Sequence, residues 1–180
     1  MKRLVVAIAC LCLAASTASA QSVGEKTGIN STLGISPSTP DFVKQVAVSD
    51  IFEIASSKMA QEKGAPPDKT FAAQMVTDHT KTSNELKALI SSGKVEAQIP
   101  SGLDNPHQAK LDKLKSLSGA DFSSSFRSMQ VDAHKDAVDL FERYAKSGDN
   151  SDLQKWAQNT LPALKHHLEM AQGLEKQSAK

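Results

Sequence analysis

Residues 120–147 read ADFSSSFRSMQVDAHKDAVDLFERYAKS, and the apolar side chains in them recur with the period of an α-helix. Side chains at this spacing share one face of a helix, which must be buried against other elements. The stretch therefore predicts a long amphipathic helix that packs inside a helical domain. The apolar face contains Phe122, Phe126, Met129, Ala137, Phe141 and Tyr144.

The same period extends over most of the chain, and no alternating run is long enough for a strand. Glycines and prolines divide the pattern into four long helices and one short helix. We expect the long helices from Thr39–Pro40 to Lys63, Pro67 to Ser92, Ala120 to Ser147 and Ser151 to Lys176, and the short one from Asn105 to Leu117. Because the short helix lies in the long second connection, the sequence predicts an all-α four-helix bundle with one crossover element. Pro162 should kink the last helix.

The first 20 residues have the features of an export signal. Lys2 and Arg3 precede an apolar stretch, residues 4–15, which is too short to span a membrane. Ala18-Ser19-Ala20 is typical of a cleavage site, so we expect cleavage after Ala20 and a periplasmic or secreted protein without a stable membrane span. Residues 21–39 are rich in Ser, Thr, Gly and Pro and predict a flexible linker. The bundle domain is expected over residues 40–177.

Composition excludes several classes of function. Both cysteines, Cys10 and Cys12, lie in the predicted signal, so the mature chain would have no disulfide and no thiolate ligand. Removing Lys2 and Arg3 from 21 basic residues leaves 19 against 20 acidic residues, and these charges are interspersed. With one Trp and one Tyr, the chain has neither a basic stripe nor stacking platforms, so we expect no nucleic-acid partner. No serine-nucleophile turn or phosphate loop is present.

One histidine lies on each of three long predicted helices. His79 and His167 fall within the apolar arcs of their helices, and His134 lies on the flank of its arc. His166 should point outward. Glu53 is directed inward only if the stripe that includes Phe42 faces the bundle, rather than the second stripe of that helix.

These four side chains have two interpretations. If Glu53, His79, His134 and His167 converge, they can bind a transition-metal ion such as Fe, Zn or Cu, because imidazole is a common ligand and a carboxylate balances the charge of the ion. Alternatively, each histidine hydrogen-bonds a neighbour, and together they form a polar layer that fixes helix register. Since no His-x-x-x-His or Glu-x-x-His spacing is present, the sequence narrowly favours the polar layer.

Several motifs together resemble a known family. The segments are Phe42 to Ala55, Phe71-Ala72 to Asp78-His79, Leu114 to Phe122, and Leu161-Pro162 to His167-Leu168. They are similar to the exported bacterial family called domain of unknown function 4142, which is grouped with ferritin-like bundles. The resemblance covers about residues 40–174 and implies a ferritin-like bundle of the periplasm or cell envelope with no assigned activity.

The chain lacks the ligand pattern of di-iron proteins, although it resembles this family. Such proteins use a Glu-x-x-His motif on each of two helices, whereas Val76 and Leu164 stand three residues before His79 and His167. We therefore rank three functions. The first is a non-catalytic binding or interaction module with an envelope partner. The second is a periplasmic metal-binding protein that uses the inward histidines, and the third is a degenerate di-iron oxidoreductase.

Overall fold

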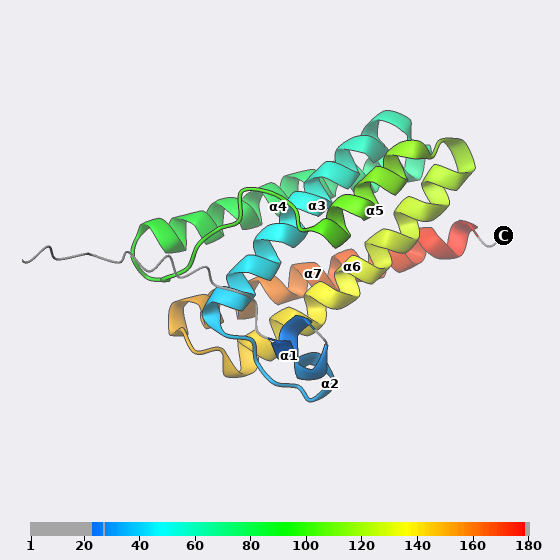
Figure 1. Cartoon of the computed structure of the whole chain (residues 1–180). Coiled ribbons are helices and arrows are strands. Elements are labelled where there is room, and N and C mark those ends of the chain that lie inside the picture. The colour runs from blue at the N-terminus through cyan, green and yellow to red at the C-terminus, as the bar shows by residue number, and fades with distance from the viewer. Residues whose placement is uncertain (1–22, 27, 179–180) are drawn as a thin grey trace, which may run out of the picture.

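The computed structural model describes residues 23–26 and 28–178, and the predicted export signal lies outside them. Every regular element in this part of the chain is a helix. Four long helices form a bundle (Figure 1): α3 (Thr39–Lys63), α4 (Pro66–Ser91), α6 (Gly119–Ser147) and α7 (Ser151–Ser178). Each begins and ends within about two residues of its predicted bounds, which confirms the all-α bundle.

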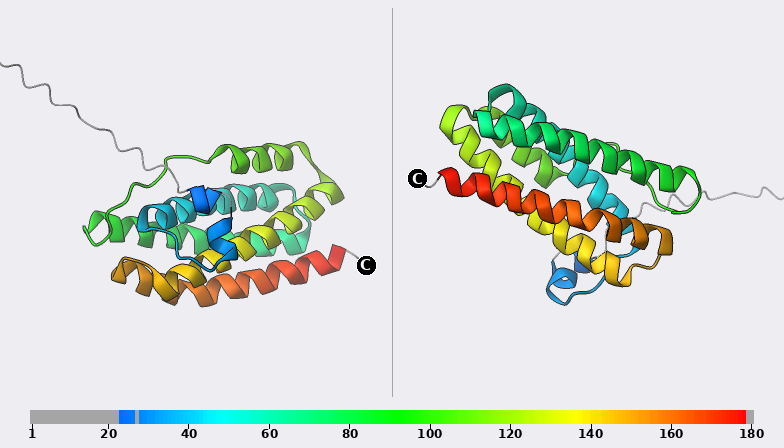
Figure 2. Two further views of the ribbon diagram at one scale, coloured as in Figure 1. Left: turned by 60° about the horizontal axis from the view of Figure 1, so that its bottom comes forward. Right: turned by 180° about the vertical axis from the view of Figure 1, so that it is seen from behind.

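The long connection between α4 and α6 contains α5 (Asn105–Ser116), as predicted. Helix α5 packs on α3 and α6, whereas α4 and α7 lie on the opposite face (Figure 2). The main contacts between helices join α3 to α4, α6 to α7, α3 to α6 and α4 to α7. All four long helices therefore surround one interior.

Local chemistry explains most helix ends. The side chain of Ser38 accepts a hydrogen bond from the backbone nitrogen of Asp41, so Ser38, rather than the expected Thr39, caps α3. The Thr39 hydroxyl instead contacts Tyr144 and Asp149. Helix α4 ends before Gly93, whose φ of 75° favours a residue without a Cβ atom.

Two apolar clusters fill the interior and leave a polar section between them. One cluster includes Phe42, Phe141 and Trp156, and the other includes Phe71 and Phe126. On α3 the stripe that includes Phe42 is the buried one, so Glu53 is also directed inward. Helix α7 is continuous through Pro162. The buried histidines lie in the polar section.

The segment predicted as a linker contains two short helices, α1 (Val23–Lys26) and α2 (Ile29–Thr32). They lie against α6 (Figure 1). Arg143 on α6 makes a 3.1 Å ion pair with Glu25, and both side chains are less than a tenth exposed. The Arg143 guanidinium also donates to the backbone oxygen of Ile35. Burying an arginine requires such partners, so residues 23–26 and 28–35 contact the bundle, where the composition predicted a flexible linker.

Candidate metal centre

His79, His134 and His167 meet in the middle of the bundle. Their side chains come from α4, α6 and α7, and none is more than 3% exposed. The ring centroids lie 5.6 Å apart for His79 and His134, 5.7 Å for His79 and His167, and 5.5 Å for His134 and His167. One ring nitrogen from each residue lies within 4.8 Å of the other two. The structure thus brings together all three histidines that the sequence analysis selected.

Each ring has one nitrogen fixed by an outer hydrogen bond. His79 donates through Nδ1 to Asp50 Oδ1 at 2.8 Å, and His167 donates through Nε2 to Asp78 Oδ2 at 2.9 Å. His134 donates through Nδ1 to the backbone oxygen of Gln130, one helical turn earlier, at 2.9 Å. Because carboxylates and carbonyls only accept, these bonds place the ring proton on the outer nitrogen.

The second nitrogen of each ring has no hydrogen-bond partner among the described residues. These atoms are Nε2 of His79, Nε2 of His134 and Nδ1 of His167, and all three are buried. In a neutral ring with its proton on the outer side, the second nitrogen carries a lone pair. Leaving one such buried acceptor unpaired costs about 1–3 kcal/mol. Three buried ring nitrogens without a partner in one cluster need a physical explanation.

Glu53 lies close to this cluster. It is 1% exposed, and neither of its carboxylate oxygens has a hydrogen-bond partner among the described residues. Burial raises the pKa of Glu53 to about 7, although the nearby positive charge of His79 acts in the opposite direction. Its oxygens do not belong to the group of mutually close ligand atoms, so Glu53 stands beside the three histidines rather than among them.

The three imidazoles differ in pKa. Burial alone would lower the pKa of His79, but the hydrogen bond and charge of Asp50, with Glu53 and Asp78, raise it above 6.5. Burial lowers the pKa of His134 to about 3, and the charge of His79 lowers it further. Burial also lowers the pKa of His167 in spite of its bond to Asp78. His134 and His167 are therefore neutral near pH 7, as metal ligands must be.

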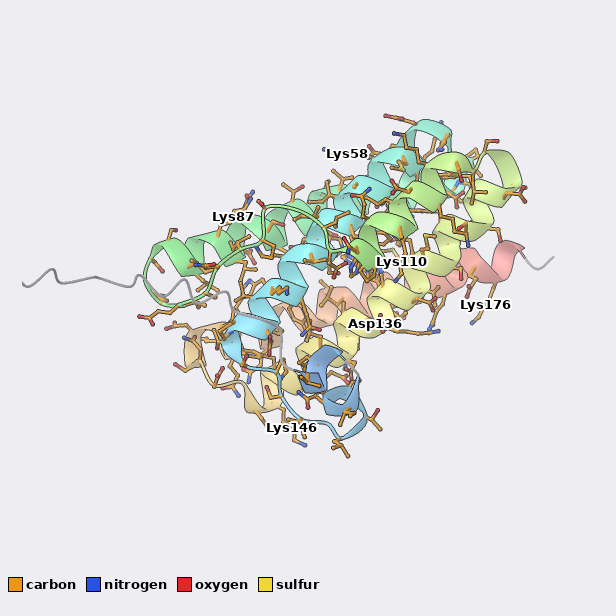
Figure 3. The ribbon with its side chains drawn as sticks, in the orientation of Figure 1. Lys58, Lys87, Lys110, Asp136, Lys146 and Lys176 are labelled. Carbon is orange, nitrogen blue, oxygen red and sulfur yellow. The ribbon has the colours of Figure 1, made fainter. Side chains whose placement is uncertain are left out.

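A cavity of about 170 Å³ approaches the cluster from the side of α5. Asp50 and His79 line its inner end, and Asp104, Lys110 and Asp136 line it nearer the surface. Figure 3 shows Lys110 and Asp136 on one face of the bundle, on α5 and α6. A water molecule has about 30 Å³ of volume in the liquid. The cavity can therefore hold several water molecules next to the His79 ring.

The two carboxylates that orient the rings were not predicted from the sequence. Asp50 was not selected, although it precedes Glu53 by three residues and so lies on the same face of α3. Asp78 was not selected either. It lies about 100° around α4 from His79, which directs it toward α7, where it meets His167. Only the packing of α4 on α7 reveals this contact.

The remaining histidines lie outside the cluster. His166 is exposed, as predicted from its position on α7. His107 is half-buried, and its ring packs against Phe52 with centroids 5.5 Å apart. Asp104 accepts hydrogen bonds from the backbone nitrogen and Nδ1 of His107. This pair caps α5.

Comparison with known proteins agrees with the fold. No curated protein matches the chain. The solved structure titled "CopM in the Cu(II)-bound form" matches with a TM-score of 0.66 and 15% sequence identity, covering 79% of this chain and 99% of that chain. At this identity the similarity concerns the fold alone. In the part of the chain that the structure describes, none of the helices combines the length and hydrophobicity required to cross a membrane.

A protein-family model also matches most of the chain. The model described as "Domain of unknown function (DUF4142)" matches residues 24–174, which begins within the segment that contains α1 and ends in α7. It includes every helix that contributes a side chain to the histidine cluster. On this evidence the chain belongs to the DUF4142 family, whose resemblance was already visible in the sequence.

Proposed function

We propose that this protein binds one transition-metal ion through His79, His134 and His167. The observation that carries the proposal is the set of three buried ring nitrogens that have no partner among the described residues, in a cluster where one nitrogen of each ring lies within 4.8 Å of the other two. Zinc–nitrogen bonds are roughly 2.0–2.1 Å long, so two nitrogens on one ion lie at most about 4.2 Å apart, and the rings would have to close from within the observed 4.8 Å. A metal ion would satisfy all three lone pairs at once.

The outer hydrogen bonds support the same proposal. Metal-binding histidines usually donate their other ring N–H to a carboxylate or a backbone carbonyl, which fixes the tautomer. Here Asp50, Asp78 and the backbone oxygen of Gln130 provide these acceptors. A polar layer, the interpretation that the sequence favoured, accounts for the outer bonds. It does not account for the inner nitrogens, which such a layer would also pair.

The chemistry of the ligands limits the class of ion. Three imidazoles with a neighbouring carboxylate suit zinc, copper, nickel or ferrous iron. A di-iron centre would need bridging carboxylates, whereas Asp50 and Asp78 are engaged with the outer nitrogens. We therefore favour one ion over a di-iron oxidoreductase. The likeness to CopM, whose title names a Cu(II)-bound form, makes copper one of the ions to test.

Export is part of this proposal and rests on the sequence. Lys2, Arg3 and the apolar stretch that follows them are typical of a signal peptide. We infer that the bundle acts in the periplasm or outside the cell. A role as an interaction module stays a prediction. Exposed apolar side chains in the N-terminal segment are the place to look for an envelope partner: Val23, Ile29, Leu33 and Ile35.

Metal analysis of the purified chain tests the proposal. We expect about one Zn(II) or Cu(II) per chain after loading and dialysis, measured by elemental analysis on protein without a histidine tag. Changing His79, His134 or His167 to alanine should each reduce affinity at least tenfold.

The matched control is His166→Ala, which removes an exposed imidazole adjacent to His167. This variant should retain full binding. Circular dichroism spectra would verify that each variant is folded. If the protein binds no ion, or if all four variants bind equally, the histidine cluster is not a metal site.

A further inference from the structure

The carboxylates around the histidine cluster affect which ion the cluster binds most tightly. Asp50 is 3% exposed and Glu53 is 1% exposed. Asp78 is less buried, with a side chain 36% exposed, so water screens its charge more strongly. Two nearly fully buried carboxylates and one at the edge thus surround three imidazoles.

This arrangement places negative charge around the point where the ring nitrogens meet. Imidazoles that bind an ion are neutral, so a bound ion supplies the positive charge at that point. Among the described residues that act on Glu53, Lys110 is the cationic side chain apart from His79. Lys110 lies near the surface end of the cavity. A bound ion would therefore supply positive charge at the inner end of the cavity.

We infer, on the basis of the proposed function, that the site selects a divalent ion over a monovalent ion such as Cu(I) or Ag(I), and that Glu53 is the main selectivity-determining residue. The attraction between an ion and a fixed carboxylate is proportional to the charge of the ion. The electrostatic attraction between Glu53 and a divalent ion is therefore twice that between Glu53 and a monovalent ion in the same place. Burial strengthens this difference because little water screens the carboxylate.

The absence of sulfur ligands points in the same direction. Soft monovalent copper is selected by thiolate and thioether ligands. Both cysteines of the chain lie in the first 12 residues, and no cysteine occurs in the described part. The nearest methionine along α4, Met75, is one turn before His79 and belongs to the apolar cluster with Phe71 and Phe126. The histidine cluster thus presents nitrogen and oxygen atoms.

Competition titrations of the full chain against chromophoric chelators test this inference. The probes are Zn(II) and Ag(I), the latter as an air-stable substitute for Cu(I). We expect Zn(II) to bind at least a hundredfold more tightly than Ag(I). Glu53→Gln should weaken Zn(II) binding about tenfold and Ag(I) binding only about threefold, since the free-energy change scales with ionic charge.

Two control variants make the comparison specific. Glu142→Gln removes an exposed carboxylate on α6 and should change neither affinity. Met75→Leu should also leave both unchanged; a selective loss of Ag(I) binding would reveal a sulfur ligand and overturn the inference.

The inference and the proposed function can fail separately. Equal or tighter Ag(I) binding, or an equal loss of both ions in Glu53→Gln, would overturn the selectivity while leaving a metal site in place. Failure of both ions to bind would overturn the proposed function as well.

Discussion

At the scale of single residues, the buried charge of Glu53 destabilises the folded protein. A carboxyl group with an ordinary pKa of 4.5 has a pKa of about 7 here because burial penalises its charged form. A catalytic or ligand-binding role is a usual reason for a protein to retain such a group. The proposed ion would pair the ring nitrogens and place a positive charge near the buried Glu53 carboxylate.

The raised pKa leads to a prediction about stability and pH. The folded state holds the Glu53 proton more tightly than the unfolded state, so stability falls as pH rises from about 4.5 to about 7. Glu53→Gln removes this effect. In metal-free buffer at pH 8 we expect the variant to be more stable than the parent by about 1–3 kcal/mol. The difference should approach zero at pH 4.

Urea denaturation in the presence of a chelator would measure the difference in stability between the parent and Glu53→Gln at pH 8 and at pH 4. Glu142→Gln, which alters an exposed carboxylate, serves as the control and should show no comparable pH-dependent gain. A parent protein that is more stable than Glu53→Gln at pH 8 would contradict the assigned cost of the buried charge.

At the scale of elements, residues 23–26 and 28–35 make polar contacts with α6 and, through Gln45, with α3. Arg143 connects Glu25, Asp139 and the backbone oxygen of Ile35. The large apolar side chains of this segment are exposed and supply little burial in their place. The attachment of α1 and α2 should therefore be sensitive to Arg143.

Arg143→Ala should destabilise the protein by about 3 kcal/mol, because it leaves the buried Glu25 carboxylate without this partner. We also expect faster protease cleavage within residues 23–38 than in the parent. Limited proteolysis followed by mass spectrometry would locate the cleavage. Lys146→Ala, an exposed position on the same helix, is the control. Equal cleavage rates in the two variants would show that Arg143 does not hold the segment.

At the scale of the whole molecule, the proposed ion would join α4, α6 and α7, since each contributes one histidine. A ligand that binds only the folded state adds about 2.7 kcal/mol of stability at a hundred times its dissociation constant. For a domain of this size that corresponds to a rise in Tm of roughly 5–10 °C.

We expect Zn(II) to produce such a rise in the parent protein, and a chelator to reverse it, as measured by thermal denaturation. His79→Ala should show no rise, whereas His166→Ala should respond like the parent. A rise of the same size in all three proteins would indicate binding elsewhere on the surface.

Helix positions followed largely from local rules. The periodic apolar residues, the prolines at helix starts and the glycines at helix ends are visible in the chain itself, and the observed bounds agree within about two residues. The N-terminal segment was harder, because the ion-pair partner of Glu25, Arg143, lies 118 residues away along the chain. Composition alone cannot show an ion pair of that separation.

The sequence by itself determined the all-α class, the four long helices, the short crossover helix and the inward direction of His79 and His167, because these depend on repeats within single helices. Tertiary structure decided which stripe of α3 is buried, and therefore where Glu53 lies. It also decided that Asp50 and Asp78 orient His79 and His167. These contacts join different helices, so they depend on the register in which the helices pack, which no single periodic pattern specifies.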